Sequence, residues 1–191
     1  MFADDMSAYR YVKTAEDAAL LQDDLNKMAL WEERWDMKFH PEKCSVLSVS
    51  RSMHPKLFDY QLHGHTLLHE SSSKYLGVTI NSDLRWGQHI DNVCCNANKT
   101  LGFVKRNLKI SSQTIKERAY KALIRPKVEY SATVWDPHTA RDINKIEAIQ
   151  RRSARYCLNR YRDYSSVSDM LIHLDWPSLE SRRKAARLTT H

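Results

Sequence analysis

Apolar residues recur at helical spacing over residues 15–37, with polar residues between them. Thr14 precedes this stretch and Asp17 stands three residues later, an arrangement typical of a capping box at a helix start. Pro41 ends the helical pattern. The apolar stripe consists of Ala18, Leu21, Leu25, Met28 and Trp35, and the other face of Asp23, Asp24, Lys27, Glu32 and Glu33. We therefore expect a helix that packs through the first set and leaves the second set in solvent.

Short runs of β-type pattern follow this helix, separated by turn residues. His63-Gly64 predicts a tight turn between two strands, and the three serines at 71–73 predict a connector. The last strand would place Leu76, Val78 and Ile80 on one face. The segments predicted as strands are 45–50, 58–62, 66–68 and 75–80.

From Trp86 onward the apolar period becomes helical. Ser112 is a plausible cap for the second helix, and Pro126 should bend or end it. The expected apolar stripes are Ile90, Val93, Ala97, Leu101 and Val104; Ile115, Ala119, Ala122 and Leu123; and Ile143, Ile146, Ile149, Ala154 and Cys157, followed by two shorter helices over 167–174 and 179–188. We predict an α+β fold, with a helix and short antiparallel strands over residues 1–82 and an all-helical region over 83–191.

Composition narrows the class of protein. Only 4 glycines among 191 residues favour a helix-rich chain. No apolar run reaches the length of about 18 residues that spans a bilayer, and Met1 is followed by acids rather than by a secretory leader. The four cysteines include no Cys-x-x-Cys pair, so we expect reduced, buried thiols. The expected location is intracellular, cytoplasmic and nuclear, without secretion or membrane partners.

Charge is divided unevenly along the chain. Residues 1–98 carry 10 Lys and Arg against 14 Asp and Glu, whereas residues 99–191 carry 20 against 9. The acidic half suits metal ions and the basic half suits phosphates. The alternative interpretation is that these charges are solvated helix faces.

Asp4 and Asp5 are adjacent carboxylates close to the first residue. Carboxylates of this kind are hard ligands for Mg²⁺, and nucleotidyl-transfer enzymes use them to hold two metal ions around a phosphoryl group. By itself the pair is weak evidence for such a metal site, because the Ala-Asp-Asp tripeptide is common. Its weight depends on the motifs that follow.

Those motifs occur in the order found in one polymerase family. They are Phe2-Ala3-Asp4-Asp5, Trp31 to Phe39, His40-Pro41-Glu42-Lys43-Cys44, Tyr75-Leu76-Gly77-Val78, Leu84 to Ile90, Leu101-Gly102-Phe103, Ala122 to Tyr130, Trp135-Asp136-Pro137 and Ile146 to Arg155. With them the chain resembles the reverse transcriptases of non-LTR retrotransposons of the jockey and long-interspersed-element type. The resemblance covers nearly the whole chain and fades after about residue 175. His40 departs from the asparagine usual in this family.

The resemblance implies roles for particular residues. Asp4 and Asp5 would be catalytic metal ligands for Mg²⁺, and Lys43 would approach the triphosphate and protonate the departing pyrophosphate. Tyr75, Leu76 and Gly77 would grip the primer terminus, with Gly77 allowing close backbone approach. The alternatives are an exposed Lys43 without a catalytic role and an ordinary strand glycine at position 77.

The basic helical region would correspond to the thumb of such a polymerase. A thumb follows a duplex without reading its sequence, so it needs contacts to phosphates. Lys145, Arg151, Arg152 and Arg155 would supply them, although Arg152 lies about 100° around the helix from Arg151. Tyr156 and Tyr161 are candidates for base stacking.

Other polar and aromatic groups receive simpler interpretations. Trp86 and Trp135 are expected in the core. Arg182-Arg183-Lys184 is either a basic patch or a surface cluster, and His63, His65 and His69 lack the spacing of a zinc site.

The sequence thus predicts residues 1–82 as the C-terminal part of a reverse-transcriptase palm and 83–191 as a thumb with a C-terminal extension. The parent activity would be RNA-directed DNA synthesis, with an RNA template, a DNA primer or RNA–DNA duplex, and deoxynucleoside triphosphates as partners. We expect the isolated chain to be inactive, because the fingers, a further metal-binding Asp, and the N-terminal polymerase and endonuclease regions are missing. The alternatives are a non-enzymatic nucleic-acid-binding module and a degenerate element fragment without selected function. Met1 is either a true start or an internal methionine of a longer frame.

Overall fold

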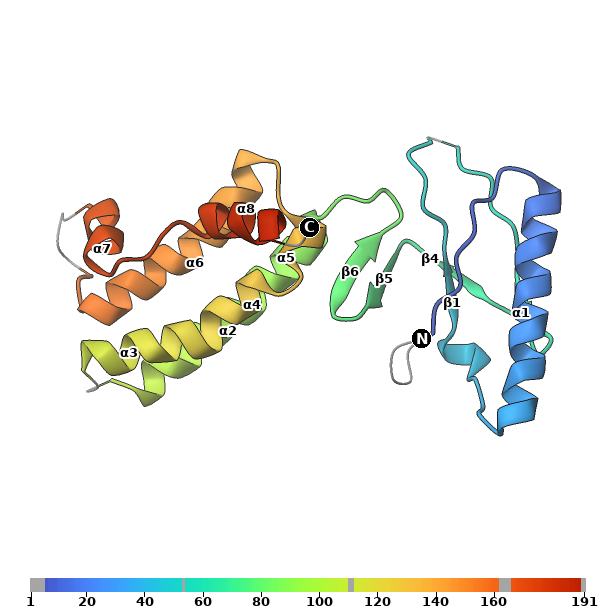
Figure 1. Cartoon of the computed structure of the whole chain (residues 1–191), viewed down its shortest axis with the longest axis horizontal. Helices are drawn as coiled ribbons and strands as arrows, with labels where there is room; N and C mark the ends of the chain where they lie inside the picture. Colours follow the sequence, from blue (N-terminus) through green and yellow to red (C-terminus); the bar gives the residue numbers. More distant parts are fainter. Residues whose placement is uncertain (1–5, 53, 110–111, 162–165, 190–191) are drawn as a thin grey trace. The chain divides into compact units, whose positions relative to one another are not determined.

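The computed structural model describes residues 6–52, 54–109, 112–161 and 166–189. It divides into two compact units, Met1–Arg85 and Trp86–His191 (Figure 1). The first unit combines one long helix with short strands, and the second contains helices. This mixture of helix and strand agrees with the predicted α+β class. The names palm and thumb stay predictions.

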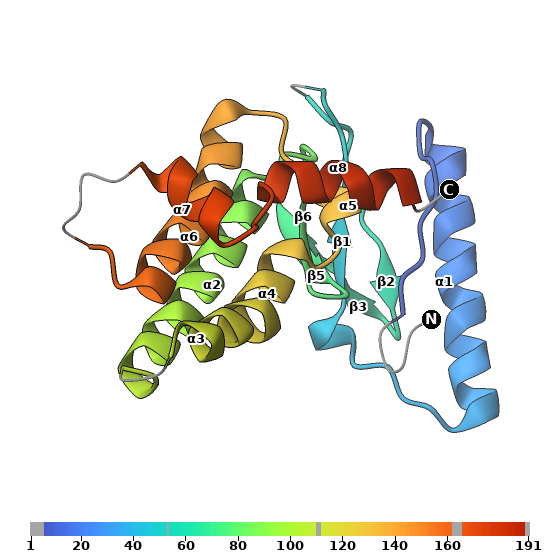
Figure 2. The ribbon, with the colours of Figure 1, turned by 60° about the vertical axis from the view of Figure 1, so that its left-hand side comes forward.

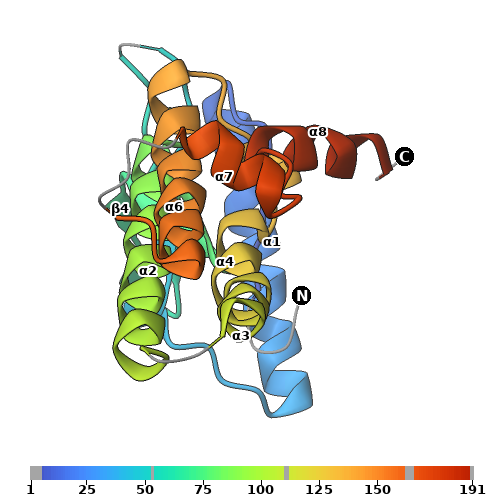
Figure 3. The same ribbon diagram turned by 90° about the vertical axis from the view of Figure 1, so that its left-hand side faces the viewer.

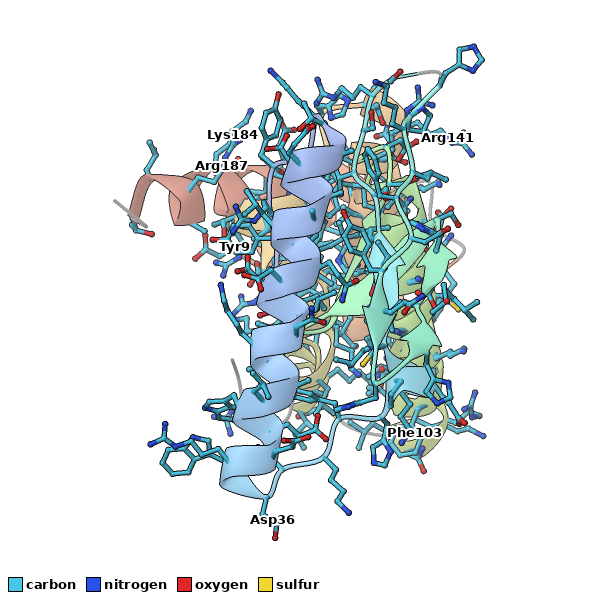
Figure 4. All side chains as sticks on the ribbon, turned by 90° about the vertical axis from the view of Figure 1, so that its right-hand side faces the viewer. Tyr9, Asp36, Phe103, Arg141, Lys184 and Arg187 are labelled. Carbon is cyan, nitrogen blue, oxygen red and sulfur yellow. The ribbon has the colours of Figure 1, made fainter. Side chains whose placement is uncertain are left out.

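Helix α1 (Ala15–Trp35) begins at the predicted cap. The Asp17 amide donates to the Thr14 hydroxyl at 3.3 Å, and the Thr14 amide donates to the Asp17 carboxylate at 3.0 Å. The two bonds satisfy amides that a helix start otherwise leaves unpaired, so the capping box is confirmed. The helix ends at Asp36, which adopts a left-handed conformation and marks the C-terminal end of α1 in Figure 4.

The first unit has a small core. Its buried residues are Ala18, Tyr60, Leu62 and Leu67, and its partly buried members include Leu21 and Leu25 of α1. The predicted apolar stripe is therefore correct in the first half of α1. It is wrong for Trp35, which is 62% exposed. Trp35 lies in the last turn of α1, where its ring centroid is 6.5 Å from that of Trp31.

Glu32 is buried, with 7% exposure, although the sequence pattern assigns it to the solvent face. Its carboxylate lies 2.7 Å from Nε2 of His63, which occupies the turn between two strands. The hydrogen bond with His63 is the main cause that lowers the pKa of Glu32 below its ordinary value. The prediction of a solvated Glu32 is wrong because a partner distant in sequence satisfies the carboxylate.

The Glu32–His63 contact predicts an acid-sensitive first unit. A carboxyl whose folded pKa is depressed stabilises the fold above its unfolded pKa and loses that contribution as pH falls through the folded value. Unfolding midpoints in urea should therefore drop between about pH 5 and pH 3 in the wild type more steeply than in Glu32→Gln. Equal slopes for the two proteins would contradict the assignment.

Among the described residues, the strands form three separate pairs; several of these strands are labelled in Figure 2. Strand β1 (Ser45–Leu47) pairs in parallel with β4 (Leu68–Glu70). Strand β2 (Gln61–Leu62) pairs antiparallel with β3 (His65–Thr66), and β5 (Ser72–Tyr75) pairs antiparallel with β6 (Val78–Asn81). The expectation of antiparallel strands throughout is wrong for β1 and β4, because the long connection between them allows a parallel return.

The segment 75–80 is a hairpin rather than the single strand that its alternation predicts. Leu76 (φ 46°) and Gly77 (φ 81°) form the turn between β5 and β6. Two successive positive φ angles are the signature of the tight turn that matches strand twist. Ser72 and Ser73 belong to β5, so the predicted serine connector is also wrong. Leucine seldom adopts positive φ, which hides this turn from the sequence pattern. His63 (φ 51°) and Gly64 (φ 76°) form the predicted turn.

The second unit is a bundle of helices. Its longest members, α2 (Gly87–Asn107) and α6 (Ala140–Leu158), lie side by side (Figure 3). The other helical segments are α3 (Gln113–Ala119), a π-helical turn (Tyr120–Ile124), α4 (Arg125–Glu129), α5 (Ala132–Trp135), α7 (Val167–His173) and α8 (Leu179–Thr189). The predicted cap at Ser112 is present, since its hydroxyl accepts from the Ile115 amide at 3.5 Å.

Pro126 does not end the second helical stretch. A π-helical turn precedes the proline, so that Pro126 stands in the first turn of α4 and helical structure continues to Glu129. The buried side of this helical stretch consists of Lys116, Tyr120, Ile124 and Val128. The predicted stripe of Ile115 and Leu123 is wrong, because these side chains are 49% and 46% exposed. In a regular α-helix, every fourth side chain moves about 40° around the helix axis. A π-helical turn has more residues per turn and reduces that rotation, so burial recurs every four residues.

Trp135 is fully buried, which confirms its prediction as a core residue. Its indole N–H donates to the Tyr130 carbonyl at 2.9 Å, and its ring meets His89 edge-on at 5.2 Å between centroids. Burial lowers the pKa of His89. Trp86 is only half-buried, so the core prediction holds for it in part.

Helix α8 is attached through arginines. Arg183 is 1% exposed and its Nε donates to Asp136 at 2.8 Å, while Arg187 reaches the other oxygen of Asp136 at 3.0 Å. Arg182 pairs with Glu129. Lys184 is exposed and pairs with Glu180 at 2.7 Å; it is labelled with Arg187 in Figure 4. Arg182 and Arg183 therefore attach α8 to the rest of the unit. From the sequence, the Arg182-Arg183-Lys184 run is interpreted as a basic patch or a surface cluster, and neither interpretation describes these two arginines.

Candidate nucleic-acid interface

The predicted metal ligands Asp4 and Asp5 lie outside the described residues. Within the described ranges, no group of three or more His, Cys, Asp or Glu residues is placed to hold a metal ion. His63 and His69 each have a carboxylate nearby instead, Glu32 at 2.7 Å and Asp59 at 3.5 Å. The assignment of Asp4 and Asp5 to Mg²⁺ therefore stays a prediction from sequence.

Lys43 lies in a single turn of 3₁₀-helix, Pro41–Lys43, directly before β1. Its side chain is exposed, and its amide donates to the His40 carbonyl at 2.9 Å. Proline at the start of this turn fixes the backbone before the strand. The position leaves the ammonium group accessible to an anionic ligand.

Tyr75, Leu76 and Gly77 occupy the turn end of the β5–β6 hairpin. At the other end of the hairpin, the Ser50 amide donates to the Ser82 carbonyl at 2.9 Å, which ties the chain after β1 to the hairpin. Tyr75 and Leu76 are half-buried and Gly77 is exposed. A turn with positive φ explains the glycine at 77, and the predicted primer-contacting role remains open to test.

Helices α2 and α6 run in the same direction and contact each other at intervals of seven residues. Lys145 Nζ lies 2.5 Å from Asp91, and one heptad later Arg152 Nη1 donates to Asn98 at 2.9 Å. A further heptad along α2, Lys105 lies over aromatic rings. Equal steps on both helices are characteristic of parallel packing with a coiled-coil-like seam.

Lys145 is the most strongly paired of the four predicted phosphate-binding residues. Besides Asp91, it lies 3.6 Å from Asp142. The hydrogen bond with Asp91 is the main cause that raises the pKa of Lys145 above its usual value. Two nearby carboxylates reduce the attraction of this ammonium for a phosphate.

Arg151, Arg152 and Arg155 keep their charges available. Arg151 donates to the Asn144 carbonyl and Arg152 to the Asn98 amide oxygen, and both acceptors are neutral. Among the described residues, no carboxylate forms a salt bridge with any of the three. At about 100° per residue, Arg155 falls between the other two, so all three lie within a sector of about 100°. By the same geometry, Arg141 near the start of α6 also falls in this sector; it is labelled in Figure 4.

Lys105 and Tyr161 complete this surface. Lys105 Nζ lies 5.4 Å from the centroid of the Tyr161 ring, which is 57% exposed. Burial, together with the nearby Arg152, lowers the pKa of Lys105. We define Lys105, Arg151, Arg152, Arg155 and Tyr161 as the α2–α6 basic face. Lys105 is not among the residues predicted from sequence. It stands seven residues after Asn98, and this spacing indicates a position facing α6 only when the pairing of α2 with α6 is known.

Tyr156 does not belong to the α2–α6 basic face. It is 4% exposed, and its hydroxyl donates to the Leu108 carbonyl at 2.9 Å. Burial raises the pKa of this hydroxyl. Tyr156 therefore joins the end of α2 to α6, and the prediction that it is available for stacking is wrong because its ring packs inward. Tyr161 retains that possibility.

Three of the cysteines, Cys44, Cys94 and Cys157, offer no activated thiol, because burial raises the pKa of each. All four are free; Cys157 is buried as predicted, whereas Cys44 and Cys94 are half-buried and Cys95 is exposed. Burial raises the pKa of Cys94 to about 11 and that of Cys157 to about 12. Such thiols stay protonated at neutral pH and are poor nucleophiles. Within the described part of the chain, no helix combines the length and the apolarity that a membrane span requires.

Comparison with known proteins identifies relatives of one kind. Over 81% of the chain, a probable RNA-directed DNA polymerase from transposon BS of Drosophila melanogaster is 26% identical. The RNA-directed DNA polymerase from the mobile element jockey of the same species is 26% identical, and a probable RNA-directed DNA polymerase from transposon X-element is 24% identical, each over the same share. The curated homologues are thus jockey-type and other Drosophila transposon polymerases, at modest identity, which confirms the resemblance.

The chain spans only about 17–18% of the length of these relatives. No family model matches the chain. No solved structure matches it either.

Proposed function

We propose that the chain is the C-terminal palm and thumb portion of the RNA-directed DNA polymerase of a non-LTR transposon, acting in the cytoplasm and the nucleus. Its part in that enzyme is to hold the RNA–DNA duplex through the α2–α6 basic face. The homology to transposon polymerases over 81% of the chain supports the enzyme class. The arrangement of cations along α2 and α6 supports the duplex-binding role.

The observation that carries this proposal is that, among the described residues, no carboxylate forms a salt bridge with Arg151, Arg152 or Arg155, whereas Lys145 pairs with two. Arg151 and Arg152 are held by neutral acceptors and therefore keep their full attraction for phosphates. Phosphate contacts fix the position of a duplex without reading its sequence, which is what a polymerase needs as it moves. Lys145 belongs to the same helix, and we expect a smaller contribution from it because Asp91 and Asp142 compensate its charge.

The catalytic part of the proposal rests on the first unit. Asp4 and Asp5 are the ligands expected for Mg²⁺, which in a complete polymerase stabilises the transferring phosphoryl group. Lys43 is exposed and accessible to a triphosphate, and Tyr75, Leu76 and Gly77 form a hairpin turn that would contact the primer strand. A turn with a small exposed residue permits close approach of backbone to a ligand.

The isolated chain is expected to bind duplex and to synthesise no DNA. The test is primer extension on an RNA template with Mg²⁺ and deoxynucleoside triphosphates, comparing the chain with Asp4→Ala. The expected result is no extension by either protein, with duplex binding intact in both. Metal-dependent extension that is lost in Asp4→Ala would contradict the inactivity and would identify Asp4 as catalytic.

A non-enzymatic nucleic-acid-binding module is the second candidate. The specific observation in its favour is that the α2–α6 basic face lies wholly within the Trp86–His191 unit. Primer extension by a longer protein that contains this chain would distinguish the two functions. A longer protein that extends primers supports the polymerase, whereas one that binds duplex without extension supports the binding module.

A further inference from the structure

Helix α2 and the segment after it carry basic side chains and no acidic ones. Residues 92–116 contain no Asp or Glu. The cations in this stretch are Lys99, Lys105, Arg106, Lys109 and Lys116. Lys116 is buried and donates to Asn159 at 2.8 Å, and Lys105 belongs to the α2–α6 basic face. The cations that α2 exposes outside that face are Lys99 and Arg106.

Lys99 and Arg106 lie on a third side of α2, which faces neither the core nor α6. At about 100° per residue, they are about 20° apart around the helix axis, and Phe103 lies about 40° from Lys99. The buried residues of the same turns lie about 140–200° from Lys99; they are Ala97, Leu101 and Val104. We define Lys99, Phe103 and Arg106 as the outer α2 face.

Phe103 is 57% exposed, and it is labelled in Figure 4. It stands four residues after Lys99 and three before Arg106, so both cations are its neighbours on the helix surface. The side chain of Arg106 extends back along α2, with Nη1 3.4 Å from the point where a Cβ at Gly102 would stand. The missing side chain at position 102 therefore leaves room for a guanidinium close to the aromatic residue.

The charges of the outer α2 face are not compensated. In the described part of the chain, neither Lys99 nor Arg106 forms a salt bridge. Exposed lysines elsewhere in the unit pair within their own helical stretch: Lys121 lies 3.9 Å from Glu117, and Lys184 lies 2.7 Å from Glu180. The outer α2 face thus combines two available cations with an exposed ring. A ligand that carries both negative charges and flat rings complements this combination, and nucleic acid is such a ligand.

We propose that the outer α2 face binds single-stranded nucleic acid. Phe103 stacks on one base, and Lys99 and Arg106 contact phosphates on either side of it. The two cations are seven residues apart, about 10 Å along the helix, so they reach different phosphates of one strand. Inside a duplex, neighbouring base pairs cover both faces of each base, so a protein ring stacks on unpaired bases. This site lies outside the α2–α6 basic face and does not depend on the duplex-binding role.

Fluorescence anisotropy of the full chain with a labelled oligo-dT of about 12 nucleotides tests the stacking. Phe103→Ala should bind about 5- to 100-fold more weakly, the range for the loss of one stacked base. Phe103→Leu keeps an apolar side chain and should still lose at least about threefold, whereas Phe103→Trp should retain the wild-type affinity. Ile172→Ala on α7, where the side chain is 77% exposed, is the matched control and should leave the affinity unchanged.

Removal of the two cations tests the phosphate contacts. Lys99→Gln combined with Arg106→Gln should make the slope of log affinity against log salt shallower by about 1.4, or about 0.7 for each contact to a single strand. Lys121→Gln combined with Lys184→Gln removes the same charge from lysines that already pair with glutamates, and should leave the slope unchanged. Far-UV circular dichroism verifies that each variant is folded.

A blunt RNA–DNA duplex separates this proposal from the duplex-binding role. Phe103→Leu should bind the blunt duplex like the wild type. If no protein binds the blunt duplex, the duplex-binding role is wrong, and the oligo-dT measurement still decides the present proposal. Absence of oligo-dT binding by the wild type overturns the proposal, as does equal oligo-dT affinity of the wild type and Phe103→Leu. Poly-glutamate that binds as tightly as oligo-dT also overturns it, because the face would then recognise charge alone.

Discussion

Replacing Asp136 by alanine is expected to destabilise the Trp86–His191 unit by about 3–5 kcal/mol. Asp136 is the acceptor for Arg183, a side chain with 1% exposure. The two terminal nitrogens of that guanidinium are buried and have no partner among the described residues. Removing the carboxylate leaves a buried cation without compensation, and the penalty for such a charge exceeds the value of the pair itself.

Urea unfolding followed by tryptophan fluorescence measures this effect, since Trp135 and Trp176 report on the same unit. Arg183→Met is the informative control, because it removes the buried charge and keeps most of the side-chain volume. We expect it to cost less than Asp136→Ala, and the double variant to recover part of the loss. Arg187→Ala should cost less than about 1 kcal/mol because its side chain is 49% exposed. A loss below about 1 kcal/mol in Asp136→Ala would contradict the buried-pair account.

The double variant Arg152→Ala, Lys105→Ala is expected to bind RNA–DNA duplex about 10–100-fold more weakly than the wild type at moderate salt. Both cations lie on the α2–α6 seam without a carboxylate partner among the described residues. Removing each cation that binds a phosphate should also lower the slope of log affinity against log salt by about 1. Fluorescence anisotropy with a labelled duplex gives both quantities.

Lys145→Ala supplies the control on the same helix. It removes one positive charge, as each single replacement on the seam does, but a charge that Asp91 and Asp142 already compensate. We expect its affinity to stay within about threefold of the wild type. Equal losses in Lys145→Ala and Arg152→Ala would mean that net charge alone governs binding. In that case the geometry of the α2–α6 basic face would be irrelevant.

The sequence predicts local features of this fold well. The capping box at Thr14 and Asp17 and the turn at His63-Gly64 follow from short-range chemistry that any chain with those residues shares. The long amphipathic helices α2 and α6 follow from their apolar stripes, several of whose members are buried.

The errors arise where distant segments or unusual backbone decide the outcome. Glu32 is buried because His63, 31 residues away, provides its partner. Leu76 occupies a turn that its residue type disfavours. The buried side of the helical stretch starts at Lys116 rather than Ile115, and the π-helical turn at Tyr120–Ile124 continues it to Tyr120 and Ile124 instead of Leu123; no simple periodicity predicts such a turn.

The candidate site also combines features that the sequence predicts with features that only the packing decides. The arginine cluster of α6 is visible in the sequence, because Arg151, Arg152 and Arg155 fall within five residues of one another. Whether a cation of α6 is available to a phosphate depends on its partner on α2, which only the packing of the two helices reveals. Lys145 contacts the carboxylate of Asp91, whereas Arg152 contacts the neutral side chain of Asn98. Tyr156 and Tyr161 look alike in sequence, yet one is buried and the other is exposed. The number of cations was predictable, but their availability was not.

The most direct test of the duplex-binding account is the salt dependence of RNA–DNA duplex affinity for the intact chain between about 50 and 300 mM salt. Three or more phosphate contacts by the α2–α6 basic face predict a log–log slope of about −3 or steeper. That slope should become shallower by about 2 in the Arg152→Ala, Lys105→Ala variant. A slope near zero, or one that the double variant leaves unchanged, would contradict the proposal that this face holds the duplex.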